Sequence, residues 1–189
     1  GQLSFLYRRQ GPGLAGELEW WADYLSWATD NAPPTEMVEV LDWLREHRPD
    51  PEPPAGLIWG DARFGNVIFD DGFRVRAVLD WEMAGVGPAE VDLGWSFAIR
   101  RSIQRGNNLP LDAELPGFPD RGRTLERYAR RLGRTVDSLD WYEVFAMLRM
   151  GATLKSLSRL LVQRGITDHI VHTIPPLQDW IYELMERAS

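Results

Sequence analysis

Residues 59–69 read Trp-Gly-Asp-Ala-Arg-Phe-Gly-Asn-Val-Ile-Phe, and residues 78–82 read Val-Leu-Asp-Trp-Glu. The segment between them begins with Asp-Asp-Gly at 70–72, which is a strong signal for a tight turn, and then alternates apolar and basic residues. We therefore predict a β-hairpin over 67–79, with one loop before it and a second loop at 80–87.

Three oxygen-bearing side chains flank this hairpin. A hairpin brings the start of its first strand beside the end of its second, so Asn66 and Asp80 should lie close together. Both offer the hard oxygen ligands that Mg²⁺ takes from a protein when phosphates fill its other positions. Asp61 precedes Asn66 on the same loop, where it can orient a substrate hydroxyl and accept its proton. The alternative is that all three are ordinary loop residues, and the combined motif and context argue against it.

Most of the remaining chain carries the periodicity of amphipathic helices. The first helix follows Gly-Pro-Gly at 11–13 and ends before Pro33, and a stiff proline-rich linker at 49–54 follows the second. Gly165 stands where the fifth helix should stop, and 105–119 is predicted to be a long loop. The predicted helices cover 14–28, 35–46, 89–104, 121–132, 138–164 and 176–187.

These elements predict an α+β fold that is predominantly helical and carries one small inserted hairpin. A chain of 189 residues with 44% hydrophobic residues can bury one sizeable core, so we expect a single domain over 1–189. Its parts are the leading helices and linker at 1–56, the hairpin with its two loops at 57–87, and a helical subdomain at 88–189.

Composition excludes several classes of function. The net charge of −7 argues against nucleic acid as the main partner and suits a cationic small molecule. The absence of cysteine excludes disulfides, thiolate metal sites and a cysteine nucleophile. No segment approaches the roughly 18 apolar residues of a membrane span, and the first residues do not form a signal peptide, so we expect no membrane association and a cytoplasmic location.

The two quoted segments resemble the catalytic and metal-binding loops of aminoglycoside phosphotransferases, which share the protein-kinase fold with choline and homoserine kinases. The closest likeness is to the branch sometimes fused to acyl-CoA dehydrogenases. The resemblance implies the C-terminal lobe of a kinase-like fold, with ATP and Mg²⁺ as cofactors and transfer of the γ-phosphate to a hydroxyl of a small molecule. It also implies that the helical subdomain lies on the substrate side.

The resemblance assigns roles to individual positions. It implies that Asp61 is the catalytic base and that Arg63, in the same loop, is a second catalytic residue. It further implies that Asn66 is a Mg²⁺ ligand, that Asp80 is the main Mg²⁺ ligand, and that Asp92 braces the catalytic-loop backbone. Further expected contacts are Ile68 and Leu79 for the nucleotide, and Trp81, Glu82, Trp141 and Tyr142 for the substrate.

The chain departs from the family pattern in two ways. The family usually has histidine where Trp59 stands, and we expect lost hydrogen bonding and added packing there. Kinase-fold enzymes also pair a lysine of the N-terminal lobe with the ATP phosphates. Lys155, the one lysine of the chain, lies too late in the sequence for that task. We therefore expect that lobe to be absent from residues 1–189. Another part of the same polypeptide or a separate chain would supply it. The face of this chain that would contact the lobe is then exposed, which should favour self-association.

Other sequence patterns give weaker indications of function. The glycine-rich stretch 11–16 reads as a helix-start turn, because Pro12 removes a backbone N–H that a phosphate loop needs. His169 and His172 are spaced for one helix face, but lack a matched carboxylate for a metal site. The tryptophans at 20, 21, 43 and 95 fit core stripes, and Trp180 joins the pocket candidates. Arginines at 127, 130, 131 and 134 indicate a solvated helix face, with a phosphate or coenzyme A anchor as the alternative.

Two rival functions stay open. One is a catalytically silent kinase-like module that binds a partner or nucleotide, and the retained Asp61, Asn66 and Asp80 weigh against it. The other is a metal-dependent hydrolase, which is disfavoured because two oxygen ligands without histidine suit a metal-activated water poorly.

Overall fold

Helices form most of the protein, as predicted. The computed structural model describes residues 3–107, 117–165 and 179–188. Each predicted helix is present, and most of the helix ends lie within about two residues of the predicted ones. The helices are η1 (Ser4–Leu6), α1 (Gly13–Ala28), α2 (Thr35–Glu46), η2 (Phe64–Asn66), α3 (Glu90–Gly106), α4 (Arg121–Leu132), α5 (Leu139–Gln163) and α6 (Asp179–Ala188).

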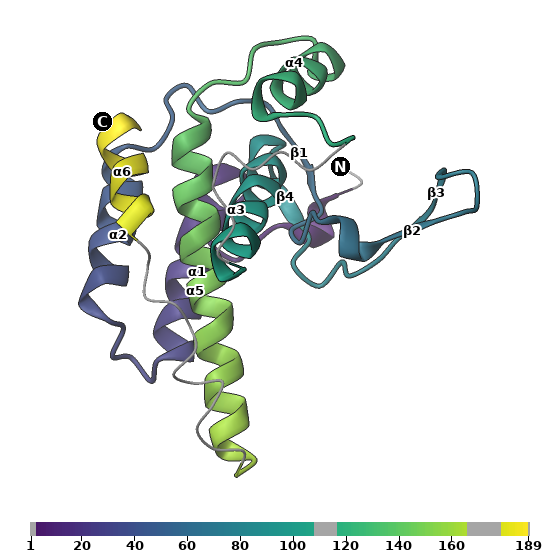
Figure 1. Ribbon diagram of the computed structural model, residues 1–189. Helices are drawn as coiled ribbons and strands as arrows, with labels where there is room; N and C mark the ends of the chain where they lie inside the picture. Colours follow the sequence, from purple (N-terminus) through teal and green to yellow (C-terminus); the bar gives the residue numbers. More distant parts are fainter. Residues whose placement is uncertain (1–2, 108–116, 166–178, 189) are drawn as a thin grey trace.

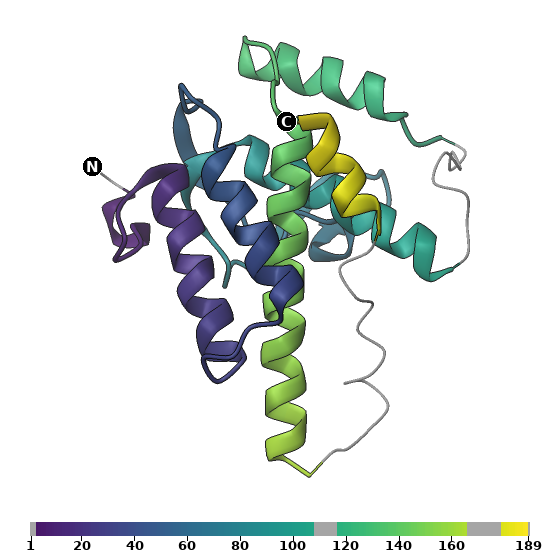
Figure 2. The same ribbon diagram turned by 90° about the vertical axis from the view of Figure 1, so that its left-hand side faces the viewer.

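The long helix α5 is the centre of the core. It contacts α1, α2, α3 and α6, and Figure 2 shows α1, α2 and α5 side by side. Its first half is apolar almost all round, which is typical of a helix that is covered on every side. Burying each large apolar side chain contributes about 1.5–3 kcal/mol. The buried members from α5 include Trp141, Tyr142, Val144, Phe145, Leu148 and Ala152.

The predicted hairpin is present as strands β2 (Val67–Phe69) and β3 (Val75–Val78). They pair antiparallel in the register Val67↔Val78 and Ile68↔Ala77. Figure 1 shows the hairpin extending away from the helical body. Several apolar side chains from η2 to just beyond the hairpin are exposed, and Phe73 reaches 87%. The exposed set is Phe64, Ile68, Phe69, Phe73, Val75, Leu79 and Trp81.

A second pair of strands was not predicted. Strand β1 (Ala55–Ile58) pairs antiparallel with β4 (Gly85–Pro88), in a register that opposes Ile58 to Gly85. The prediction of a loop over 80–87 is therefore wrong for its last residues. Glycine and proline are depleted in strands, so the sequence of β4 hides its conformation. A Cβ atom at Gly87 would lie 2.7 Å from Cδ1 of Ile58, so the Ile58 side chain would have to move to admit a larger residue there.

The connections agree with the sequence where they are described. Residues 49–54 form no regular structure, and Gly165 adopts a left-handed conformation just after α5. The region 11–16 starts α1, as expected of a helix-start turn. Much of the predicted loop 105–119, and both His169 and His172, lie outside the described residues. No helix in the described ranges has the length and apolar character needed to cross a bilayer.

Candidate active site

The carboxylate of Asp61 is held on both oxygens. Its Oδ2 accepts hydrogen bonds from Nδ2 of Asn66 at 2.7 Å and from Nε of Arg63 at 2.9 Å. Its Oδ1 accepts one from Nε1 of Trp95, also at 2.7 Å. Asp61 is only 9% exposed, so these contacts fix the carboxylate at the edge of the protein interior. The structure thus brings together three of the predicted site residues and adds Trp95.

The backbone before Asp61 is fixed from α3. Both carboxylate oxygens of Asp92 accept backbone hydrogen bonds, from Trp59 N and from Gly60 N, each at 2.8 Å. Burial raises the pKa of Asp92, and these two hydrogen bonds oppose that shift. Gly60 has φ of +97°, and a Cβ atom there would lie 2.5 Å from that of Met83. The glycine is therefore required by both conformation and space.

Arg149 was not foreseen as a site residue. It lies on α5 with 1% exposure, and its Nη2 donates a 2.8 Å hydrogen bond to the carbonyl oxygen of Gly60. Its guanidinium lies within 5.6 Å of three aromatic ring centroids. Burial lowers its pKa to about 10, against the favourable charges of Glu17 and Asp92. An arginine inside the apolar run of α5 was the sequence signal that could have revealed it.

Trp59 makes hydrogen bonds that were expected to be lost. Its indole Nε1 lies 2.8 Å from the carbonyl oxygen of Leu79 and 3.2 Å from that of Asp80. Asp80 has a φ of 62°, a conformation that non-glycine residues adopt rarely. The expectation for Trp59 is therefore wrong in part: the indole N–H acts as a donor at the base of the hairpin and supports the unusual backbone of Asp80.

The donor set at the base of the hairpin suits Mg²⁺. The backbone N–H of Leu79 donates to the carbonyl oxygen of Asn66 at 2.9 Å, which brings the following residue, Asp80, beside Asn66. Because Nδ2 of Asn66 faces Asp61, the Oδ1 atom of Asn66 is directed away from Asp61. The side chain of Asp80 is exposed. In the described ranges no three His, Cys, Asp or Glu side chains gather as a metal cluster. A cation here would therefore complete its shell with phosphate and water oxygens.

Comparison with known proteins identifies the family. The sequence profile described as "Phosphotransferase enzyme family" matches residues 4–142, which include both loops and the hairpin. The chain belongs to this phosphotransferase family. A structure of a "putative aminoglycoside phosphotransferase" from Ralstonia eutropha JMP134 superposes with a TM-score of 0.78 at 23% identity, covering 98% of this chain and 58% of that one. That likeness confirms the predicted kinase-like fold.

Curated relatives of this phosphotransferase chain are much longer. "Probable acyl-CoA dehydrogenase IBR3" of Arabidopsis thaliana is 30% identical over 159 residues, which cover 76% of this chain and 19% of the relative. "Acyl-CoA dehydrogenase family member 11" of Gallus gallus is 34% identical over 169 residues, covering 81% and 21%. The chain thus spans about one fifth of the length of these relatives.

The predicted ligand-contacting residues of the phosphotransferase divide into two groups. Ile68 and Leu79 are about half exposed on the hairpin, and Trp81 and Glu82 are exposed directly after Asp80. The second group is buried, which contradicts its assignment to a substrate pocket. Trp141 is 1% exposed with Nε1 donating to Leu44 O at 3.1 Å, and Tyr142 and Trp180 have no exposed surface.

The arginines of α4 lie on a solvated helix. No residue of α4 is buried. Arg134, just beyond its end, forms an ion pair with the buried Glu90. Arg130 lies 3.8 Å from Glu126 on the exposed surface. The prediction of a solvated face agrees with the exposure of the arginines within α4, and it is wrong for Arg134, whose guanidinium pairs with a buried carboxylate.

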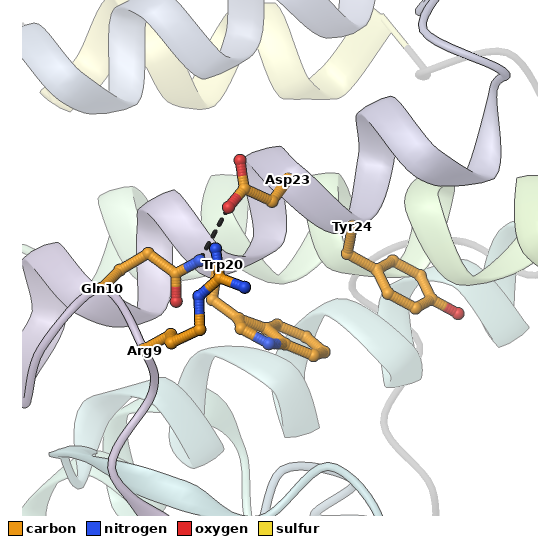
Figure 3. Close-up of a pocket in the computed structure, with 5 residues that line it drawn as sticks. All are labelled: Arg9, Gln10, Trp20, Asp23 and Tyr24. Atoms are coloured by element: carbon orange, nitrogen blue, oxygen red, sulfur yellow. Dashed lines mark hydrogen bonds between the residues drawn. The ribbon is translucent and has the colours of Figure 1, made fainter.

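Two cavities in the described ranges are lined by residues outside the loop around Asp61. One, of about 290 Å³, is lined by Arg9, Gln10, Trp20, Asp23 and Tyr24. Figure 3 shows it against α1, with Nε2 of Gln10 donating to Oδ2 of Asp23 at 2.7 Å. The other, of about 370 Å³, is lined by residues between 23 and 31 together with Arg159. Neither contains a residue of the catalytic loop.

Proposed function

We propose that this chain carries the catalytic base and metal ligands of an ATP- and Mg²⁺-dependent phosphotransferase that acts on a hydroxyl of a small molecule. The observation that carries the proposal is the 2.7 Å hydrogen bond between Asn66 Nδ2 and Asp61 Oδ2 at the base of the hairpin. It joins the side chain that we propose as the base to one that we propose as a metal ligand, and the hydrogen bond from Leu79 N to Asn66 O supports Asp80 as the second ligand. The cytoplasm, where ATP is available, is the compartment we propose.

The proposed reaction assigns one proton acceptor. The acceptor hydroxyl oxygen bonds to the γ-phosphorus, the bond from that phosphorus to the β–γ bridging oxygen breaks, and ADP leaves. The hydroxyl proton passes to the carboxylate of Asp61, which would orient the hydroxyl beforehand. Arg63, bonded to the same carboxylate, would help to hold it. Catalysis of this kind rests on positioning and charge neutralisation.

Asn66 and Asp80 are the residues we propose for Mg²⁺, which would neutralise charge on the transferring phosphates when bound. Their amide and carboxylate oxygens match its preference for hard ligands, and two protein ligands suit an ion that shares its shell with phosphates. The same scarcity of protein ligands weighs against the rival metal-dependent hydrolase, because the described residues provide no histidine ligand there.

We further propose that an N-terminal lobe completes the nucleotide site. The half-exposed Ile68 and Leu79 would then form the floor beneath the adenine. Lys155 lies on α5, so the lysine that pairs with the phosphates would come from that lobe. Trp81 and Glu82, exposed beside the metal loop, are the residues we propose for the acceptor side.

The test measures transfer of the γ-phosphate in the full-length protein across hydroxylated small molecules. Asp80→Asn should abolish turnover and leave the thermal midpoint unchanged, because the exposed side chain packs little and a charged ligand is lost. Asp71→Asn, which changes another exposed aspartate at the hairpin turn, is the control that should retain activity. Near-normal rates for Asp80→Asn would overturn the metal assignment, and nucleotide binding without transfer by the wild type would support the silent module.

A further inference from the structure

Trp95 is the partner of one particular oxygen of the candidate base. Asn66 and Arg63 both hold Oδ2 of Asp61, whereas Trp95 Nε1 holds Oδ1 at 2.7 Å. Trp95 is 4% exposed, so its ring has a fixed place in the core. A hydrogen bond from a fixed indole to Oδ1 restricts rotation of the carboxylate in a way that the bonds to Oδ2 alone do not.

One turn of α3 holds both the backbone and the side chain of this loop. Asp92 and Trp95 are three residues apart, a spacing that puts them on the same helix face. Asp92 binds the backbone N–H groups of Trp59 and Gly60, and Trp95 binds the carboxylate of the next residue, Asp61. The position of the carboxylate is therefore set directly by α3.

Arg149 supports the same arrangement from α5. Its guanidinium carbon lies 4.8 Å from the Trp95 ring centroid, within the range of a cation–π contact. Its Nη2 also donates to the carbonyl oxygen of Gly60. Nε and Nη1 of Arg149 have no hydrogen-bond partner in the described chain. The hydrogen bond that its guanidinium donates to Gly60 therefore ties it to the loop. One buried side chain thus contacts both the Trp95 indole and the Gly60 carbonyl group that precedes Asp61.

We propose that Trp95 is a positioning residue for Asp61, with Arg149 as its support. The pair fixes the rotation of the carboxylate, so that the same oxygen atom faces the acceptor hydroxyl in each turnover. This inference rests on the proposed function, in which Asp61 accepts the hydroxyl proton. Small misplacements of a reacting group slow a reaction by up to about 10²-fold, so the expected effect falls on kcat.

The decisive comparison is between Trp95→Phe and Trp21→Phe in the full-length protein. Both tryptophans are buried, and both rings lie within 5.1 Å of the Arg149 guanidinium. Nε1 of Trp21 has no hydrogen-bond partner in the described chain. Trp95→Phe therefore removes a hydrogen bond to Asp61, and Trp21→Phe does not. Trp95→Phe should lower kcat by about 10- to 100-fold and leave KM for ATP within about twofold, and Trp21→Phe should lower kcat by less than about threefold.

A double-mutant cycle and a spectrum separate the possible failures. In an Asp61→Ala background, Trp95→Phe should change kcat by less than about twofold, because the bond is already lost. In the NMR spectrum, the Trp95 indole proton should move upfield in Asp61→Ala, while that of Trp21 should not. Equal effects of Trp95→Phe and Trp21→Phe on kcat, with kcat still greatly lowered in Asp61→Ala, would overturn this inference alone. If Asp61→Ala kept full activity, the proposed function would fail instead.

Discussion

Arg149 Nη2 lies 2.8 Å from the carbonyl oxygen of Gly60, and this contact joins α5 to the loop before Asp61 across 89 positions of the sequence. The arginine carries a buried charge without a direct carboxylate partner, since Glu17, whose charge favours it, forms its ion pair with Arg8 at 2.8 Å. A buried charge of this kind is a poor source of stability. We therefore expect the contact to matter more for the geometry of the loop than for folding.

Arg149→Met tests this separation of stability from activity. Methionine fills similar space and removes a costly buried charge, so the free energy of unfolding should change by less than about 2 kcal/mol. The Gly60 carbonyl loses its donor and the loop loosens, so kcat should fall by at least about tenfold. Urea unfolding and steady-state kinetics measure the two effects. A variant that loses about 4 kcal/mol of stability would show that Arg149 is chiefly structural.

Trp59→Phe should weaken the response to Mg²⁺. The substitution removes the donor to the carbonyl oxygens of Leu79 and Asp80 and frees a backbone that adopts a rare conformation. Changes in groups that hold a metal ligand typically cost 10–100-fold in metal affinity, so we expect the Mg²⁺ concentration for half-maximal activity to rise about tenfold. In Trp59→His the Mg²⁺ concentration for half-maximal activity should rise less than in Trp59→Phe, because imidazole also carries an N–H donor.

The exposed Trp27 provides the control for that experiment, since Trp27→Phe makes the same chemical change far from the hairpin. Its Mg²⁺ dependence should match that of the wild type. An unchanged Mg²⁺ dependence in Trp59→Phe would show that the indole bonds do not support Asp80.

Glu143→Gln should alter the pH dependence of stability. Glu143 is a fully buried carboxylate that forms ion pairs with Arg121 and Arg101, and burial raises its pKa from 4.5 while Arg121 opposes the shift. A raised folded-state pKa means that the contribution of this group is fully present below its unfolded pKa and is lost as pH rises through the folded value. Glutamine does not titrate and avoids this loss.

The free energy of unfolding of Glu143→Gln, relative to the wild type, should therefore increase between pH 4.5 and about pH 8. Urea unfolding at both pH values measures the difference. Glu126→Gln, which changes an exposed side chain on α4, is the matched control and should change the free energy of unfolding by no more than about 0.5 kcal/mol, because surface substitutions act weakly. A relative stability of Glu143→Gln that falls with pH would contradict the raised pKa.

Sequence patterns predicted the parts of the fold that depend on local chemistry. Helical periodicity located α1 to α6, and the Asp-Asp-Gly turn located β2 and β3. The same hairpin placed Asn66 near Asp80, because antiparallel pairing fixes which residues meet. Strand β4 was missed because its Gly-Val-Gly-Pro sequence is shaped by tertiary close approach, a cause that no local pattern records.

The site residues that were missed or misplaced depend on long-range packing. Arg149 meets Gly60 and Trp95 meets Asp61 only through the packing of α3 and α5 against the loop. Trp141 and Tyr142 were assigned to a pocket because aromatic residues suit apolar walls. Their helix is covered on many sides, and a helix that is apolar all round gives no indication of which face lines a cavity.

The last prediction concerns the polypeptide of residues 1–189 expressed alone. Its helices bury their own core, so it should fold, as circular dichroism and cooperative unfolding would show. Without the proposed lobe and its lysine it should consume no ATP and bind Mg·ATP weakly, because phosphoryl transfer depends on complete positioning.

The exposed apolar hairpin should also make this polypeptide self-associate in sedimentation experiments. Phe73→Ser with Val75→Thr should reduce the association, because both side chains are strongly exposed and neither belongs to the loops around Asp61. Robust turnover by residues 1–189 alone would contradict the proposal that another lobe completes the site.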